Sequence, residues 1–575
     1  MRMPQLATRS VKVLAVPLLL TRVVAGAWPG CGRARPRALA VAVAVAAVSM
    51  LLALGLFAAP VGAVTVSITL KPATGPPTST VTVTGTGFGA SETVTVDFSA
   101  AQVATATTSS TGTFTATFTV PKLALPGNHP VTATGQTSGR SATRNFLVRT
   151  DWSQFHFDAA HSGFNPYENV IGPANVSGLK TAWTMASGVA GSIGSSPAVA
   201  GGVVYVGAAA GGNLYAFSAA GTTGCSGTPK TCKPLWTGTT GTIVFSSPAV
   251  AGGVVYVASA DGKLYAFGAA GTTGCSGTPK ICKPLWTAAL AGAGTVGQSS
   301  PAVAGGVVYV SADTTLYAFS AAGTTGCSGT PKVCTPLWTA TGAGGVWSPA
   351  VAGGVVYVGV GDGRFDAFSA AGTTGCSGTP PSRTCTPLWT GVTGGNGFTS
   401  PAVANGVVYF GSGDGKLYAF SAAAGSTHCS GTPKTCTPLW TAATGNGISS
   451  APAVAGGVAY VSSGDGSLYA FSATGTTGCS GTPKVCTPLW TAAGAGGQSS
   501  PAVANGVVYN GAAGKVDAFS AAGTTGCSGT PPNRTCTPLW TAATGGNTTY
   551  ASPAVANGMV YEGEWDAPFL LAFSQ

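Results

Sequence analysis

The fold is decided by a repeated stretch, one copy of which reads Ser400-Pro-Ala-Val-Ala-Asn-Gly-Val-Val-Tyr-Phe-Gly-Ser-Gly-Asp-Gly-Lys-Leu-Tyr-Ala-Phe-Ser421. It contains three short apolar pieces rich in Val, Tyr and Ala. Asn-Gly and Asp-Gly separate these pieces, and such dipeptides favour two-residue hairpin turns because they tolerate positive φ. The stretch therefore predicts three short antiparallel strands joined by tight turns.

A unit of roughly fifty residues contains this stretch and recurs from about residue 183 to the end of the chain. Each unit continues into a cysteine-containing loop and a Pro-Leu-Trp-Thr piece, which predicts a fourth strand. Four short antiparallel strands per repeat are typical of one β-propeller blade. The eight copies of Pro-Ala-Val-Ala predict an eight-bladed β-propeller, and they begin at Pro197, Pro248, Pro301, Pro349, Pro401, Pro452, Pro501 and Pro553.

The phase of the repeat predicts how the ring closes. The last unit stops in its third strand, at Gln575, whereas Thr181–Thr184 places a Trp strand ahead of the first unit. We expect this early strand to complete the last blade, which would remove the exposed edges that an open array of blades would leave.

Residues 64–149 have a different pattern, in which Thr and Val alternate between glycine-containing turns. This pattern predicts a small β-sandwich. The motif Gly85-Thr-Gly-Phe88, followed by Ser91-Glu-Thr-Val-Thr, resembles bacterial Ig-like or IPT/TIG-type surface modules. The expected fold class is therefore all-β. An Ig-like sandwich at 64–149 is followed by an entry segment at 150–180 and an eight-bladed propeller at 181–575.

The first 63 residues account for most of the net charge of +11. Seven of the 26 basic residues and none of the 15 acidic ones lie there, so no basic stripe for nucleic acid is expected in the rest of the chain. A basic segment at Arg33–Arg37, an apolar run to Ala59 and a small-residue end at Ala63 predict a signal peptide. An uncleaved membrane anchor is the alternative, since the run is long enough to span a bilayer. Either outcome places the protein outside the cytoplasm, secreted or at the cell surface.

Fourteen of the fifteen cysteines fall into seven close pairs. A zinc site needs four ligands, and each repeat offers only two thiols. An even set of regularly spaced pairs in an exported chain predicts disulfides. The expected pairs are Cys225/Cys232, Cys275/Cys282, Cys327/Cys334, Cys376/Cys385, Cys429/Cys436, Cys479/Cys486 and Cys527/Cys536.

The segment Asp151-Trp-Ser-Gln-Phe-His-Phe-Asp158 and the repeat Gly413-Asp-Gly-Lys-Leu-Tyr-Ala-Phe-Ser421 resemble PQQ-binding, quinoprotein alcohol dehydrogenase-like propellers. The resemblance covers residues 151–575 and implies the propeller fold. Dehydrogenases of that family hold the quinone over a Ca²⁺ bound by Glu and Asn, with an Asp as base and a disulfide between adjacent cysteines. No two cysteines are adjacent here. Many non-catalytic proteins share these repeats, including outer-membrane assembly lipoproteins, so no catalytic residue is assigned.

Most acidic and histidine side chains have simple structural explanations. Asp261, Asp362, Asp414 and Asp465 are expected in turns, and Asp366 and Asp517 at exposed edge positions of third strands. His156 and His161 are expected to pack or to hydrogen-bond within the entry segment. Three carboxylates depart from the repeat and predict either a Ca²⁺ site or a solvated loop in the last blade: Glu562, Glu564 and Asp566.

The repeats diverge just before each Pro-Ala-Val-Ala, where the chain enters the innermost strand. Aromatic and amide side chains there, above a Ser/Thr-lined throat, predict a binding site for a sugar or a peptide at the mouth of the channel. The alternative is that they only cap the packing between blades. The predicted site residues are Phe245, Gln298, Trp347, Phe398, Ile448, Gln498 and Tyr550.

These observations favour a monomeric, exported and non-catalytic propeller that acts as a binding or scaffolding module at the bacterial cell surface. Its partner would be an envelope protein or a glycan, with no nucleic acid and no cofactor. The membrane would be contacted only through an uncleaved N-terminal segment. Two alternatives stay open: a PQQ- and Ca²⁺-dependent oxidoreductase with a divergent site, and a purely structural surface protein.

Overall fold

The computed structural model describes residues 65–189, 192–209, 211–290, 299–396, 399–423, 428–546, 550–565 and 569–575. The predicted signal peptide, Gln298, Phe398 and Asp566 lie outside these residues. Within them the chain forms β-strands and one 3-10 turn, η1 (Val176–Gly178), which confirms the all-β class. No helix in this part of the chain is long and apolar enough to cross a membrane.

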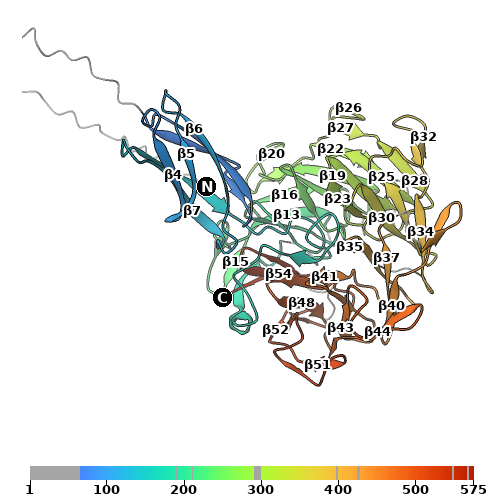
Figure 1. Ribbon diagram of the computed structural model, residues 1–575. Helices are drawn as coiled ribbons and strands as arrows, with labels where there is room; N and C mark the ends of the chain where they lie inside the picture. Colours follow the sequence, from blue (N-terminus) through green and yellow to red (C-terminus); the bar gives the residue numbers. More distant parts are fainter. Residues whose placement is uncertain are drawn as a thin grey trace, which may run out of the picture. The chain divides into compact units, whose positions relative to one another are not determined.

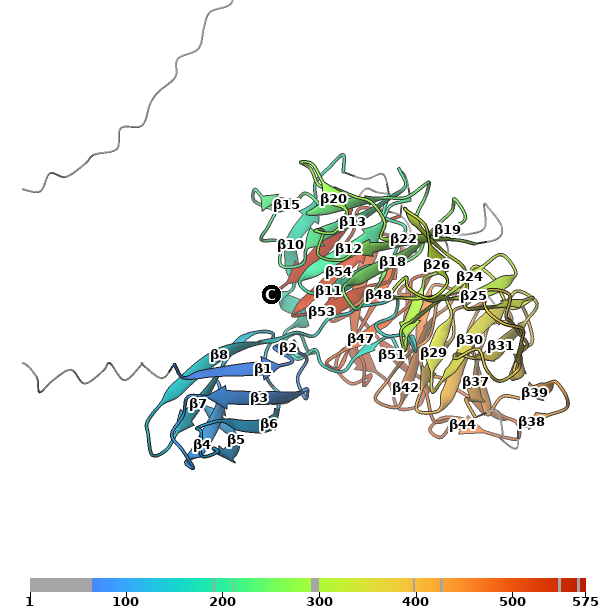
Figure 2. The same cartoon turned by 90° about the horizontal axis from the view of Figure 1, so that it is seen from above.

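The N-terminal domain is the predicted β-sandwich (Figure 2). Its two sheets have the strand orders β1-β3-β6 and β2-β8-β7-β4-β5. Val81 and Val83 of β3 are fully buried, while the threonines between them face outward, as period-two alternation requires. The strands are β1 (Ser67–Lys71), β2 (Thr74–Gly75), β3 (Thr80–Thr86), β4 (Thr93–Phe98), β5 (Ala101–Thr107), β6 (Phe114–Thr119), β7 (Gly127–Gly135) and β8 (Ser141–Val148).

The repeats fold into eight sheets of the propeller (Figure 1). Each has four strands of the kind predicted. The innermost strands are β11 (Ala198–Ala200), β17 (Ala249–Ala251), β23 (Ala302–Ala304), β29 (Ala350–Ala352), β35 (Ala402–Ala404), β41 (Ala453–Ala455), β47 (Ala502–Ala504) and β53 (Ala554–Ala556). The second strands are β12 (Val203–Gly207), β18 (Val254–Ser259), β24 (Val307–Ala312), β30 (Val355–Val360), β36 (Val407–Gly411), β42 (Val458–Ser462), β48 (Val507–Ala512) and β54 (Met559–Gly563).

The third strands are β13 (Asn213–Ser218), β19 (Lys263–Gly268), β25 (Thr315–Ser320), β31 (Arg364–Ser369), β37 (Lys416–Ser421), β43 (Ser467–Ser472), β49 (Lys515–Ser520) and β55 (Leu570–Ser574). The fourth strands are β16 (Trp236–Thr239), β22 (Trp286–Ala289), β28 (Trp338–Thr341), β34 (Trp389–Val392), β40 (Trp440–Ala443), β46 (Trp490–Ala493), β52 (Trp540–Ala543) and β10 (Lys180–Met185). The last of these, β10, precedes every other blade strand in the chain.

The two ends of the repeat region meet in one sheet. β10 pairs antiparallel with β55, with Thr181 opposite Phe573. Each innermost strand lies beside the next, and β53 lies beside β11. The propeller is thus a closed ring, joined where its first and last strands share a sheet.

Tryptophan and tyrosine side chains link neighbouring blades by hydrogen bonds. Trp440 Nε1 and Tyr409 Oη of one blade both donate to the carbonyl of Ala473 in the next, at 3.2 and 3.0 Å. Gly475 has a φ of 63°, and a Cβ there would lie 2.2 Å from the Trp440 ring. A glycine is needed at this turn because it combines left-handed backbone with close contact to the indole.

The cysteine loops form short disulfide-closed hairpins, and all seven predicted pairs are bonded. Each hairpin lies against the fourth strand of the preceding blade and extends that sheet to six strands. It therefore links neighbouring blades as well as closing its own loop. The hairpin strands are β14 (Cys225–Ser226), β15 (Lys230–Cys232), β20 (Cys275–Ser276), β21 (Ile281–Cys282), β26 (Cys327–Ser328), β27 (Lys332–Cys334), β32 (Cys376–Ser377), β33 (Thr384–Cys385), β38 (Cys429–Ser430), β39 (Lys434–Cys436), β44 (Cys479–Ser480), β45 (Lys484–Cys486), β50 (Cys527–Ser528) and β51 (Arg534–Cys536).

The entry segment runs around the inside of the ring. Its residues from Trp152 to Asn165 hydrogen-bond in turn to every innermost strand, and its short strand β9 (Phe164–Asn165) pairs in parallel with β47. The bonds join Trp152 to Val199, Ser153 to Val250, Gln154 to Val303, Ala159 to Val351, Ala160 to Val403, Ser162 to Val454, Gly163 to Val503 and Asn165 to Val555. The segment thereby fills part of the central channel and ties all the blades to one stretch of chain.

Candidate functional site

A cavity of about 350 Å³ lies at the channel mouth, above the entry segment. Its lining combines serines, aromatic rings and one amide. The lining residues are Phe155, Gly194, Ser196, Phe245, Ser247, Ser300, Val346, Trp347, Ser348, Ser400, Ser449, Ala451, Gln498, Ser500, Tyr550 and Ser552.

A ring of serines forms the throat of this cavity. In seven of the eight blades the residue before Pro-Ala-Val-Ala donates its backbone N–H to the serine Oγ of the next blade, at 2.8–3.0 Å. The bond from Ser552 N to Ser196 Oγ, at 2.9 Å, joins the last blade to the first. Each hydroxyl oxygen accepts this bond and still carries an O–H that can donate. The throat is therefore a circle of neutral donors.

The serine ring has one gap, at Ala451. Every other blade places a serine at this position, and Ala451 still donates its own N–H to Ser500 Oγ at 2.9 Å. The N–H of Ser400 has no hydroxyl to bind, because the methyl group of Ala451 replaces it. One side of an otherwise uniform throat thus differs from the rest.

Aromatic side chains cover the mouth. Trp565 lies between Phe245 and Tyr550, with ring centroids 4.7 and 4.8 Å apart. Gly194 leaves room for this cluster, since a Cβ there would be 2.8 Å from the Trp565 ring. Sequence reasoning missed Trp565 and Phe155, although Trp565 was visible as an aromatic residue that interrupts the repeat.

Four of the seven predicted site residues line the cavity together: Phe245, Trp347, Gln498 and Tyr550. Ile448 does not line it. It is fully buried in the core, close to Gly411, and its neighbour Ser449 lines the cavity instead. The cause is the alternation of an extended chain, in which successive side chains point to opposite sides.

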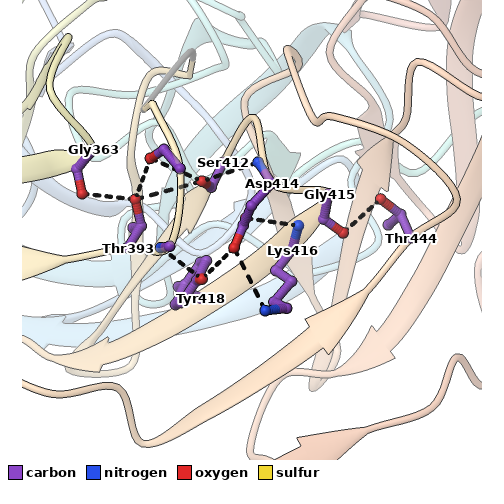
Figure 3. Close-up of polar contacts among 10 residues, drawn as sticks. Gly363, Thr393, Ser412, Asp414, Gly415, Lys416, Tyr418 and Thr444 are labelled. Atoms are coloured by element: carbon purple, nitrogen blue, oxygen red, sulfur yellow. Dashed lines mark hydrogen bonds and ion pairs between the residues drawn. The ribbon is translucent and has the colours of Figure 1, made fainter.

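Hydrogen-bonded turns hold the connectors that lead to the mouth (Figure 3). Tyr418 Oη donates to Asp414 Oδ2 at 2.6 Å and accepts the N–H of Gly394 at 2.8 Å. Thr393 Oγ1 donates to the carbonyl of Gly363 at 2.7 Å, which ties the connector to its own blade. Burial and the Asp414 hydrogen bond raise the pKa of Tyr418 to about 12, so the hydroxyl stays protonated as a donor. The turn position expected for Asp414 is correct, and through Tyr418 the residue also holds the connector that enters its own blade.

Two of the three predicted carboxylates, Glu562 and Glu564, do not lie on a solvated loop. Glu562 is part of β54 and fully buried, and Glu564 is also fully buried; both contradict that expectation. Glu562 occupies the strand position held by Val206 in the first repeat, so it faces the seam between two blades. Burial, together with the charge of Glu564, raises the pKa of Glu562 well above its usual range. No group of three metal-ligating side chains occurs among the described residues, which do not include Asp566.

Asp366 and Asp517 are buried, so the expectation of exposed edge positions is wrong. Thr390 and Thr541 of the neighbouring strands donate hydroxyl hydrogen bonds to them, at 2.7 and 2.6 Å. Lys515 Nζ lies 2.6 Å from Asp517 Oδ2. The third strand is not an edge strand, because the fourth strand pairs with it. Side chains of such a central strand are covered on both faces of the sheet.

The two histidines of the entry segment are buried beneath the cavity. His156 Nδ1 lies 3.0 Å from the carbonyl oxygen of His161. Burial lowers the pKa of His156 to about 4 and that of His161 to about 3, the latter with a contribution from His156. Both rings are therefore neutral at physiological pH and serve the packing of the segment.

The described lining contains no Asp, Glu, Lys, Arg or His. These residues offer no carboxylate that could hold Ca²⁺ and no cation that could pair with the carboxylates of PQQ, so they do not fit that cofactor. Hydroxyl donors and aromatic faces without charge suit a neutral, hydroxyl-rich ligand.

Comparison with known proteins agrees with the fold. A family model described as outer membrane protein assembly factor BamB matches residues 175–324, 283–432 and 429–526, and a macroglobulin-like domain model matches residues 63–148. BamB from Moraxella catarrhalis is similar in structure, with a TM-score of 0.46 and 16% identity over 69% of this chain and 98% of its own. A europium-containing methanol dehydrogenase has a TM-score of 0.49 and 13% identity, over 74% of this chain and 98% of its own. No curated protein sequence gives a match.

Proposed function

Since the chain belongs to the family described as outer membrane protein assembly factor BamB, we propose that it is an extracytoplasmic binding module whose channel mouth takes a neutral glycan. The observation that carries this proposal is the pairing of aromatic rings with a ring of serine hydroxyls in one uncharged cavity. Aromatic faces stack on the apolar faces of sugar rings, and the hydroxyls supply directional hydrogen bonds. Seven disulfides support a location outside the cytoplasm.

The proposal is tested on the disulfide-bonded chain with an array of neutral and acidic bacterial glycans, followed by calorimetric titration of the best neutral one. We expect saturable binding of a neutral glycan. Replacing Trp347 and Tyr550 with Ala should weaken it at least about tenfold, because each aromatic contact contributes about 1 kcal/mol. Ile281→Ala, on an exposed rim hairpin, is the matched control and should bind as wild type.

Three results would overturn the proposal. Binding that survives the double substitution would show that the ligand lies elsewhere. Saturable, Ca²⁺-dependent binding of PQQ, followed by Trp fluorescence, would instead favour an oxidoreductase. Binding of acidic glycans alone, or of none, would contradict the neutral character of the cavity.

A further inference from the structure

The outer edges of the propeller sheets differ at one blade. Seven of the eight sheets are extended outward by the disulfide hairpin of the following blade. The sheet of β47, β48, β49 and β52 is not, and β52 ends it on the outer side (Figure 1). The hairpins arise between third and fourth strands, and the described residues contain no such loop between β55 and β10. Among the described residues nothing therefore extends the sheet beyond β52.

The covered edges show what a fourth strand binds. Thr237 donates its N–H to the carbonyl of Lys280, and Thr339 to that of Arg383, both at 3.0 Å. Thr541 occupies the same place in β52, one residue after the tryptophan. In a β-ladder the backbone groups of one residue point to the same side, so the N–H and the carbonyl of Thr541 both face outward.

The uncovered edge is also more exposed than its counterparts. Thr541 is exposed, whereas Thr237 is half-buried. Trp540 is 9% exposed against 2% for Trp440. Trp540 Nε1 does find an acceptor, the carbonyl of Leu179 at 3.0 Å. The turn at η1, which contacts β52, thus supplies the acceptor that in other blades is a carbonyl after the next third strand, such as that of Ala473. Among the described residues no strand pairs with the outer edge of β52.

At the seven fourth strands whose outer edge is covered, the strand that covers it is always of the same kind. Each is a short strand that runs parallel to the fourth strand and places a β-branched residue opposite its threonine. The pairs are Thr184/Thr231, Thr237/Ile281, Thr287/Val333, Thr339/Thr384, Thr390/Thr435, Thr441/Val485 and Thr491/Thr535. The molecule itself therefore defines the geometry and the side chain that a β52 edge accepts.

We propose that the outer edge of β52 is a docking site for an extended strand of a partner protein, added in parallel with a β-branched residue opposite Thr541. Strand addition of this kind obtains its affinity from backbone hydrogen bonds and its selectivity from alternate side chains. β52 has only four residues. Because a short edge strand offers few backbone groups for pairing, it limits unspecific aggregation and leaves room for a specific partner. This site lies at the rim and is independent of the channel mouth.

The probe is a fluorescent, disulfide-closed peptide with the sequence of residues 479–486, Cys-Ser-Gly-Thr-Pro-Lys-Val-Cys, titrated into the full chain by anisotropy. We expect saturable binding at one site. Thr541→Pro removes the N–H and should weaken binding at least about tenfold, while Thr541→Ala keeps the N–H and should bind within about twofold of wild type. The peptide N-methylated at its last cysteine should also fail to bind, because that N–H faces the Thr541 carbonyl in a parallel ladder.

The proposal is wrong if the peptide does not bind at millimolar concentration, or if Thr541→Pro and Thr541→Ala weaken it equally. The methylated peptide keeps the test valid if Thr541→Pro does not fold. Hydrogen exchange gives a second readout: the Thr541 amide should exchange faster than that of Thr441 and become protected by the peptide. Equal protection of both amides without peptide would mean that the chain already covers this edge, which would also overturn the proposal.

Discussion

The rim and the channel mouth of the propeller are built from the same repeat. The sequence of the rim is nearly constant from blade to blade, whereas the sequence of the mouth changes. At the rim, the cysteine hairpins and the Trp strands are nearly identical from blade to blade. At the mouth, the position three residues before each Pro-Ala-Val-Ala differs in most blades and includes Gly194, Phe245, Val346, Ser449, Gln498 and Tyr550. The rim hairpins make the same contacts with the preceding blade seven times, whereas the mouth residues line a cavity, where the blades need not carry the same side chain.

This difference indicates where the blades serve stability and where they serve recognition. A ring of identical blades offers only a symmetric throat, and an asymmetric ligand needs blades that differ. The aromatic cluster of Phe245, Tyr550 and Trp565 and the gap at Ala451 provide that asymmetry. The substitutions below test the comparison.

The largest expected difference is between two tryptophans. Trp440→Ala at the rim should lower the free energy of unfolding by about 4 kcal/mol, because it empties a buried site and removes the hydrogen bond to Ala473. Trp347→Ala at the half-exposed mouth should cost less than about 1 kcal/mol. Urea denaturation of both variants measures the contrast. Equal losses would mean that Trp347 caps blade packing instead of facing a ligand.

Opening one rim hairpin should have the next largest effect. Cys479→Ala with Cys486→Ala removes a disulfide that closes a loop with a sequence separation of 7. The lost constraint on the unfolded chain corresponds to about 2.5 kcal/mol. Denaturation with and without a reductant provides the comparison, since the two proteins should become equally stable once all their disulfides are reduced. A variant as stable as wild type would show that this disulfide does not stabilise the protein by constraining the unfolded chain.

Glu562→Val should stabilise the protein at neutral pH. The raised pKa of Glu562 means that the folded state binds the proton more tightly than the unfolded state, so the stability of the wild type falls as pH rises above 4.5. Valine, which occupies this position in the first repeat, should raise the free energy of unfolding by about 2 kcal/mol at pH near 8 and by much less at pH near 4. Melting temperatures of the variant and the wild type between pH near 4 and pH near 8 test this prediction. A gain that does not depend on pH would show that folding does not raise the pKa of Glu562.

The smallest expected change is at the gap in the serine ring. Ala451→Ser supplies an acceptor for the Ser400 N–H and should stabilise the fold by about 1 kcal/mol. Ser247→Ala is the matched opposite, since it removes the acceptor of the Ser196 N–H and should cost a similar amount. Calorimetric unfolding of the pair tests this. If Ala451→Ser has no effect while Ser247→Ala destabilises, the Ser400 N–H already has another acceptor.

Much of the site could be predicted from the repeat, and the errors have physical causes. Divergent positions before each innermost strand identified Phe245, Trp347, Gln498 and Tyr550 as neighbours of one cavity. Ile448 was wrong by one residue: it lies four residues before Pro452, whereas Ser449 lies three residues before it, as Phe245 and Gln498 do in their blades, and lines the cavity. Phe155 came from the entry segment, whose path around the channel depends on hydrogen bonds to strands far away in the chain.

The sequence by itself determined the strands, the turns, the seven cysteine pairs and the position of β10 as the strand that precedes the repeats. Each depends on residues that lie close together in the chain, where propensity and spacing decide. Only the tertiary structure decided that a hairpin pairs with the preceding blade, that no strand among the described residues extends the sheet of β52, and that Glu562, Asp366 and Asp517 are buried. Those features arise where strands from separate parts of the chain meet, and a carboxylate in a repeat carries no local sign of which neighbour will enclose it.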